Sequence, residues 1–280
     1  MKKYIVGILI ILMMISPLYA SSGTSITLGE ATANNNAYKN SMINYFQTKT
    51  DINLNDVDVD IITANDVNKI SKDITGITYS AKDIYSCAFV DLNANRDNIK
   101  VVVDNSKITT VTPKMYANAL ESAGIDKGLV VVSSPKVATG EAALAGVLNS
   151  YESAVGSFIP DSVKKASTEE LYLETELVNE TGASGDKIAD LFSEVKDQVE
   201  KENVTSVNDI KVIVINIANN MNININNEQA QDIAESVSKT QDVKDELKGF
   251  EDNLNNIASE VQSSGIIDQI INFIKKLFNL

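Results

Sequence analysis

The most regular hydrophobic pattern in the chain lies at residues 108–148. An apolar stripe with helical spacing follows Thr112, whose hydroxyl suits the N-cap position of a helix. A continuous apolar run at 129–132 is typical of a strand that is buried on both faces. Thr139 then suits the N-cap of a second helix at 140–154. With a short strand at its start, this segment predicts strand, helix, strand and helix in succession.

Shorter patterns before this segment predict further strands and helices. Alternating residues at 52–62 predict a half-exposed strand with Val57, Val59 and Ile61 on its apolar face. Polar residues at 93–98 separate two other strands, which predicts an antiparallel hairpin. The expected elements are strands at 25–28, 52–62, 84–92 and 99–103, a helix at 36–47 and, after an Asn65 cap, a helix at 66–70.

The patterns after residue 158 are almost all helical. Residues 159–161 contain a proline and are typical of a linker. Helix N-caps are predicted at Ser167 with Glu170, at Ser184, at Ser206, and at Asn226 with Gln229. The chain is therefore predicted to have the α+β fold class, with a mixed-sheet N-terminal domain at 25–158 followed by an all-helical C-terminal region at 162–280.

The first residues have the pattern of an export signal. Two lysines precede an apolar run at 4–15, and Ala20 or Ser22 offers a small side chain for cleavage. The run is shorter than the roughly 20 residues that span a membrane, which favours a signal peptide at 1–22 over an N-terminal anchor that is kept. The protein is therefore expected to be secreted or held at the outer face of the cell envelope.

The acidic composition bears on the choice of partner. The 280-residue chain has a formal net charge of −14, and loss of Lys2 and Lys3 with the signal would leave −16. Because nucleic-acid binding depends on clustered lysine and arginine, the composition argues against nucleic acid as a partner. The same charge opposes general attraction to anionic lipids and favours loose cation binding.

The absence of histidine removes several classes of chemistry. Ser–His–Asp and Cys–His catalysis cannot be built, nor can a histidine-ligated zinc or copper site. Cys87 is the only cysteine, so the monomer has no disulfide and no thiolate metal site. Its apolar neighbours in the sequence predict a buried, inert thiol.

Two runs of oxygen-bearing side chains are candidates for calcium, the one cofactor that the sequence suggests. The run at 56–60 lacks the glycine and the closing acid of an EF-hand loop, so an acidic strand face explains it better. In the second run, oxygens of alternate side chains could converge on one ion. A turn between two strands also favours Asn and Asp, and this is the preferred explanation. This second metal candidate consists of Asp91, Asn93, Asn95 and Asp97.

A serine–lysine pattern, S-x-x-K, recurs along the chain. The S-D-N and K-T-G motifs that accompany it in penicillin-binding enzymes are absent, so we attribute the pattern to chance. It occurs at Ser133 and Lys136, Ser162 and Lys165, Ser184 and Lys187, Ser193 and Lys196, and Ser236 and Lys239.

The end of the chain, at 266–280, has the pattern of an amphipathic helix. Such a helix can lie on a membrane surface or in the groove of a protein partner. The alternative is a last helix that packs on the core of its own chain, which is the commoner use of this pattern. The possible membrane or partner face consists of Ile266, Ile270, Phe273, Ile274, Leu277 and Phe278.

The segment at 108–148 also resembles a known family, the secreted YpuA-like proteins that share domain of unknown function 1002. The resemblance rests on the run Met115-Tyr116-Ala117-Asn118-Ala119-Leu120, on Ala123 and Gly124, and on Gly140, Ala142, Ala143, Leu144 and Gly146. Residues 136–138 depart from the family pattern, because they are polar and small. The resemblance implies an exported protein and brings no catalytic residues.

These observations favour an exported, non-catalytic protein that binds a ligand or associates with the cell envelope. Two alternatives stay open. One is an extracellular hydrolase that uses a pair of carboxylates, since the chain has 38 acidic residues. The other is a membrane-surface protein that docks through its C-terminal amphipathic helix.

Overall fold

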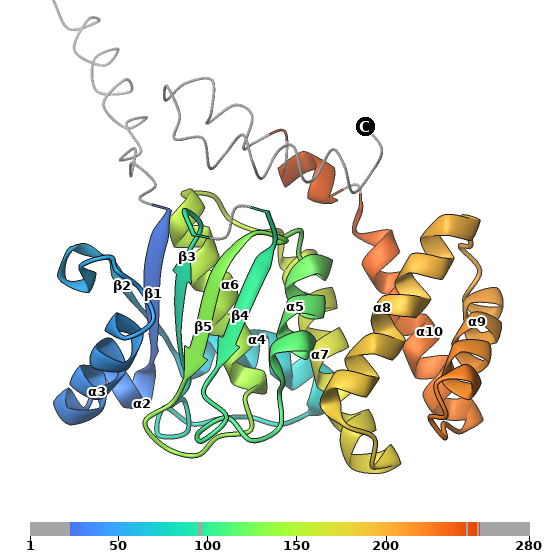
Figure 1. The fold of residues 1–280 in the computed structure, drawn as a ribbon, viewed down its shortest axis with the longest axis horizontal. Helices are drawn as coiled ribbons and strands as arrows, with labels where there is room; N and C mark the ends of the chain where they lie inside the picture. Colours follow the sequence, from blue (N-terminus) through green and yellow to red (C-terminus); the bar gives the residue numbers. More distant parts are fainter. Residues whose placement is uncertain (1–22, 95–96, 245, 251, 253–280) are drawn as a thin grey trace, which may run out of the picture.

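The strands form one mixed sheet in the computed structural model, which describes residues 23–94, 97–244, 246–250 and 252 (Figure 1). Its order is β2-β1-β3-β5-β4, and β3 runs antiparallel to both of its neighbours, whereas the two outer pairs are parallel. The strands are β1 (Thr24–Gly29), β2 (Val59–Ile62), β3 (Cys87–Asp91), β4 (Ile99–Val103) and β5 (Gly128–Ser133). The helices are α2 (Glu30–Ala33), α3 (Asn36–Gln47), α4 (Ala64–Thr75), α5 (Pro113–Ser122), α6 (Glu141–Val155), α7 (Asp161–Thr181), α8 (Gly185–Glu202), α9 (Val207–Asn220) and α10 (Asn227–Asp242), with a short 3₁₀ turn, η1 (Leu54–Asp56).

Helices cover both faces of the sheet, which explains the burial of its central strands. Successive side chains of β3 point to opposite faces. Phe89 packs against Phe46 of α3, whereas Val90 belongs to the apolar cluster that α5 and α6 complete. β1, β3 and β5 are buried along their whole length, so the strand predicted at 129–132 is confirmed.

The predicted hairpin between β3 and β4 is wrong, because β5 lies between these strands. β4 leads through α5 into β5, and two parallel strands need a crossover of this kind. β5 is apolar on both faces and takes the inner position, while the half-exposed β4 takes the edge. The strand predicted at the start of 108–148 is also wrong, since Ile108 makes only an isolated bridge to Ala138.

The predicted strand at 52–62 is much shorter than expected. The side chain of Asn53 accepts a hydrogen bond from a backbone amide two residues later and caps η1, so local bonding replaces strand pairing there. β2 begins at Val59, and its expected apolar face is wrong because Val59 and Ile61 are 38% and 51% exposed. Ile62 is buried in their place.

The two helix starts in the 108–148 segment differ from each other. Thr112 caps α5 as predicted, because its hydroxyl accepts from the backbone of Met115. Thr139 does not cap α6, whose N-cap is Gly140 with φ +118°. The Tyr116 hydroxyl donates to the Gly140 carbonyl over 2.6 Å, and a side chain at position 140 would overlap Ile108. Close packing against α5 therefore selects glycine at this helix start.

Of the other predicted helix caps, some are confirmed and some are wrong. α4 begins after Thr63, which forms a capping box with Asp66, so Asn65 is not the cap. α7 begins at Asp161, which leaves the predicted Ser167 and Glu170 pair buried in the middle of a helix. The cap at Ser184 and the capping box of Asn226 with Gln229 are confirmed, whereas the Ser206 side chain makes no cap bond.

The α+β class is confirmed, with the sheet in the N-terminal half and helices after it (Figure 1). Glu152 ties α6 to the start of α7, because its carboxylate accepts from the Ile159 amide over 2.8 Å and from Lys164 over 2.9 Å. α7 contributes Val163 and Leu171 to the core beneath the sheet, and α8, α9 and α10 enclose a second core. The division of the chain into 25–158 and 162–280 stays a prediction.

Several predicted features lie outside the described residues. They are the signal segment at 1–22, Asn95 of the calcium candidate, and the whole amphipathic face at 266–280. Within the described part of the chain, none of the helices combines the length and the apolar character that crossing a membrane requires.

Candidate functional site

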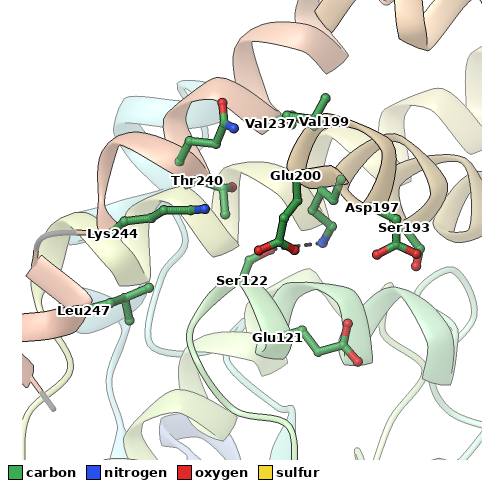
Figure 2. A pocket seen from close by; sticks show the side chains of 12 residues that line it. Glu121, Ser122, Ser193, Asp197, Val199, Glu200, Val237, Thr240, Lys244 and Leu247 are labelled. Carbon is green, nitrogen blue, oxygen red and sulfur yellow. Dashed lines mark hydrogen bonds between the residues drawn. The ribbon is translucent and has the colours of Figure 1, made fainter. Parts of the chain in front are cut away.

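A pocket of about 140 Å³ lies where α5, α8 and α10 meet (Figure 2). We call it the Lys196 pocket. Charged side chains from α5 and α8 line it together with Lys244, and Val199, Val237 and Leu247 supply apolar wall. Its polar lining includes Glu121, Ser122, Lys196, Asp197, Glu200, Thr240, Gln241 and Lys244.

A buried ion pair forms the base of this pocket. The Lys196 ammonium donates to Glu170 Oε1 over 2.8 Å and to Ser122 Oγ over 3.1 Å. Ser122 in turn donates to the second Glu170 oxygen over 2.7 Å. The Glu170 side chain is fully buried, whereas that of Lys196 is 20% exposed at the pocket wall. The three groups therefore satisfy one another in a closed triangle.

Helical spacing and one close helix contact bring these groups together. Asn118 and Ser122 are four residues apart on α5, and Glu170 and Glu174 are four residues apart on α7, so each pair shares a helix face. α8 approaches α5 closely because its first residue is Gly185. A side chain there would lie 2.6 Å from a Thr112 methyl group.

Asn118 joins three helices within this network. Its Nδ2 group donates to Glu174 Oε1 over 2.9 Å and to the Ala189 carbonyl of α8 over 2.7 Å. The other Glu174 oxygen, Oε2, is buried without a hydrogen-bond partner in the described structure. Burial, and next the charge of Glu170, raise the pKa of Glu174 well above its usual range. The surroundings of Glu174 therefore favour its protonated form.

Lys196 is charged at neutral pH. Burial alone would lower its pKa, but the charge of Glu170 and its hydrogen bond to Lys196 oppose this effect and the net pKa is raised. Ser122 and Lys196 have the separation of a serine–lysine dyad, and Ser193 and Lys196 form one of the S-x-x-K matches. An ammonium cannot accept a proton from serine, so this pair does not supply a general base.

The two buried glutamates do not form a hydrolase site either. Neither Glu170 nor Glu174 lines the Lys196 pocket. Glu170 is neutralised by Lys196, and Glu174 contacts Asn118 of the protein itself. The arrangement presents a fixed ammonium and hydroxyl to a small pocket, which suits binding of a polar molecule.

The calcium candidate is a turn in the structure. Asp91 is 4% exposed, and its Oδ1 accepts from the backbone amides of Asn93 over 2.9 Å and Ala94 over 3.3 Å. Burial raises the pKa of Asp91, and these two bonds oppose the increase. No group of three or more potential metal-ligating acids or cysteines gathers among the described residues, which include Asp97.

Cys87 is buried, as the sequence predicted. Its Sγ lies 3.2 Å from the Tyr85 carbonyl oxygen, and the side chain is 1% exposed. Burial raises the pKa of the thiol to about 11, so the thiolate is scarce at neutral pH.

Sequence reasoning missed the members of the buried network, although α7 carries a signal. Glu170 and Glu174 occupy the same helical stripe as the buried Val163 and Leu177. An acid within an apolar stripe indicates a buried carboxylate that must find a partner or stay protonated. The capping-box interpretation concealed this signal, because it placed Glu170 at the start of the helix.

The fold and the site together define an α+β protein with a polar network buried between three helices and open to a small pocket. The chain belongs to a family described as protein of unknown function, DUF1002, whose model matches residues 28–257. It is 26% identical over 185 residues to Uncharacterized protein YpuA of Bacillus subtilis (strain 168), and the match covers 63% of each chain. No solved structure matches it. The family resemblance read from 108–148 is therefore confirmed.

Replacing Lys196 by methionine should leave Glu170 buried without its counter-charge. We expect the free energy of unfolding, measured by urea denaturation, to fall by about 3–5 kcal/mol. The matched control is Lys239→Met, which breaks a pair with Glu169 whose lysine is 55% exposed, and it should cost at most about 1 kcal/mol. Equal losses in the two variants would contradict the buried-pair interpretation.

Glu174→Gln should change how stability depends on pH. Because the pKa of Glu174 is raised in the folded state above its usual 4.5, the stabilisation from its protonated form is present at low pH. This stabilisation is lost as pH rises through the folded-state pKa, whereas the amide does not titrate. The glutamine variant should therefore gain stability relative to the wild type as pH rises, in urea titrations at several pH values. The same trend in Glu176→Gln, at an exposed site on the same helix, would argue against burial as the cause.

Proposed function

We propose that this protein is exported and binds a small polar molecule in the Lys196 pocket without transforming it. The observation that carries the proposal is the fixed ammonium at the base of the pocket, held by the fully buried Glu170. A lysine kept charged and a serine that already donates to a carboxylate are binding groups, not a nucleophile and its base.

The position of the first strand supports export. β1 begins at Thr24, and the backbone amide of Gly23 donates to the Ala154 carbonyl over 3.2 Å. Cleavage after Ala20 or Ser22 would therefore leave every described strand intact. The signal pattern at 1–22 supplies the remaining support, which comes from the sequence alone.

The pocket suits a ligand with charges of both signs. Lys196 and Lys244 supply positive charge. Glu121, Asp197 and Glu200 supply negative charge around the pocket (Figure 2). A dry cavity of about 150 Å³ holds one benzene molecule, so a ligand of about that size fits. A small amino acid or a similar zwitterion meets both conditions.

The alternatives have less support. The two glutamates of α7 contact protein groups, so this pair does not supply the two substrate-facing acids that a carboxylate-based hydrolase needs. Docking through the face at 266–280 rests on the sequence pattern alone, since those residues lie outside the described structure.

The export part of the proposal predicts a processed protein outside the cytoplasm. Intact mass measurement of the extracellular or envelope fraction should find a chain that begins at Ser21 or Gly23. Replacing both Lys2 and Lys3 by glutamate should retain the full-length chain in the cell, because the positive n-region is lost. A full-length protein that stays with the membrane would indicate a retained anchor and contradict cleavage.

The binding part predicts a ligand-dependent rise in melting temperature. Glycine, alanine and serine are the probes, with acetate and methylamine as singly charged controls. At about 100 times Kd, a bound zwitterion should raise Tm by about 5 °C or more. Glu200→Gln at the pocket should reduce the rise, and Glu194→Gln, an exposed site on the same helix, should preserve it. An unchanged Tm with all three amino acids would overturn the assignment of ligand class.

A further inference from the structure

Two tyrosines and a lysine form a cluster that shares no residue with the Lys196 pocket. The rings of Tyr38 and Tyr85 meet edge to face, with centroids 6.2 Å apart and planes at 73°. We call these two rings the tyrosine pair. The Lys136 ammonium lies 4.6 Å from the Tyr85 centroid and 5.5 Å from the Tyr38 centroid. Both distances are within the limit of about 6 Å at which a ring face attracts a cation.

The tyrosine pair lies at the edge of the sheet where most strands end. β1, β2, β4 and β5 run in one direction, because β3 is antiparallel to both of its neighbours and the outer pairs are parallel. Lys136 follows β5, Tyr85 lies just before β3, and Tyr38 is in α3, which follows β1. In open sheets with parallel strands, ligands bind outside the carboxyl ends of those strands. The position of the cluster is therefore one that suits a ligand.

The backbones that carry the two rings are held by bonds that do not involve the lysine. The Tyr85 carbonyl accepts from Thr32 Oγ1 over 2.7 Å. Tyr38 lies in the first turn of α3, where its amide donates to the capping Asn35 Oδ1 over 3.2 Å. The rings therefore keep a fixed backbone support when the cation between them changes.

Lys136 is held only loosely by this site. Its side chain is exposed and donates to the Tyr85 hydroxyl over 3.1 Å. Among the described residues it forms no salt bridge with a carboxylate. The hydrogen bonds to Tyr85 and then to Tyr38 raise the pKa of Lys136, so the occupant is a cation. Because exposed contacts of this kind are weak, another cation can replace the lysine at little cost.

We propose that the tyrosine pair binds the quaternary ammonium group of a small molecule or a lipid headgroup, which displaces Lys136. The ammonium of lysine is strongly hydrated, whereas a quaternary ammonium is covered by methyl groups and donates no hydrogen bond to water. The quaternary cation therefore loses less when it leaves water for the ring faces, and aromatic cages recognise it on this basis. The formal net charge of −14 also favours a cationic ligand.

The test titrates choline into the full chain at constant ionic strength and follows the tyrosine ring signals by NMR. Lys136→Ala should tighten choline binding about three- to sixfold, because the competing ammonium is removed. The matched control is Lys49→Ala. It removes the same charge from a lysine that lies 5.0 Å from the centroid of a single ring, Tyr45, and it should change Kd by less than about twofold.

Removing either ring gives a second measurement. Tyr38→Leu and Tyr85→Leu should each weaken choline binding at least about fivefold, because one of the two ring faces is lost. Melting curves check that each variant is folded, and Tyr38→Leu keeps the test available if Tyr85→Leu is unstable. Glu200→Gln, at the Lys196 pocket, should leave choline binding unchanged, which separates this site from the proposed amino-acid site.

Vesicle sedimentation distinguishes the two sources of the ligand. Sedimentation with phosphatidylcholine vesicles but not with phosphatidylglycerol vesicles, lost in Tyr85→Leu, would identify a lipid headgroup. Binding of free choline without sedimentation would identify a soluble compound. Either result supports the tyrosine pair as the site.

Three results would contradict the proposal. Equally tight binding of dimethylbutanol, the neutral carbon isostere of choline, would show that the site does not recognise a cation. Equal tightening in Lys49→Ala and Lys136→Ala would mean that choline responds to the net charge of the chain. A lower melting temperature of Lys136→Ala, with no choline-induced shift of the ring signals, would show that the lysine contact serves only stability.

Discussion

The burial of Glu170 opposite Lys196 limits how the helices of this protein can pack. A carboxylate inside a protein is costly unless an opposite charge and hydrogen-bond donors reach it. Lys196 comes from α8, and Ser122 of α5 supplies the other contact, so the groups that satisfy Glu170 tie α7, α8 and α5 together. Since α5 is also the crossover between two strands, the same interaction relates the helical part of the chain to the sheet.

This constraint also explains the character of the pocket. The carboxylate of Glu170 and the proton of Ser122 make their hydrogen bonds within the network. The group that remains at the surface of the pocket is the Lys196 ammonium, which is already paired with Glu170. Such a group does not take a proton. The chemistry of the site follows from the packing of three helices and does not require any residue placed there for reactivity.

The sequence predicted elements well wherever local chemistry agreed with the final environment. The cap at Thr112, the capping box at Asn226 and the buried run at 129–132 depend on neighbours within a few residues. Predictions failed where contacts with distant parts of the chain determine the structure. The inner position of β5, the glycine start of α6 and the edge position of β2 all depend on contacts between segments far apart in sequence.

The site was the hardest part to foresee, for the same reason. A glutamate such as Glu170 is compatible with a helix start, an exposed face or a buried pair, and the position of α8 identifies its partner. Periodicity could have shown that Glu170 and Glu174 lie on the apolar stripe of α7. It could not have shown that Lys196, more than twenty residues later, would reach one of them.

The four-residue edge strand β2 has a consequence for the behaviour of the molecule at high concentration. An open sheet edge with the exposed Val59 and Ile61 can pair with the same edge of another copy and begin aggregation. Here Asp58 and Asp60 alternate with the two apolar residues, and Ser153 of α6 holds Asp60 by a hydrogen bond. Two copies brought edge to edge would bring these carboxylates together. Asp58 and Asp60, which belong to the run at 56–60 that resembles a calcium loop, would therefore oppose self-association at this edge through charge repulsion.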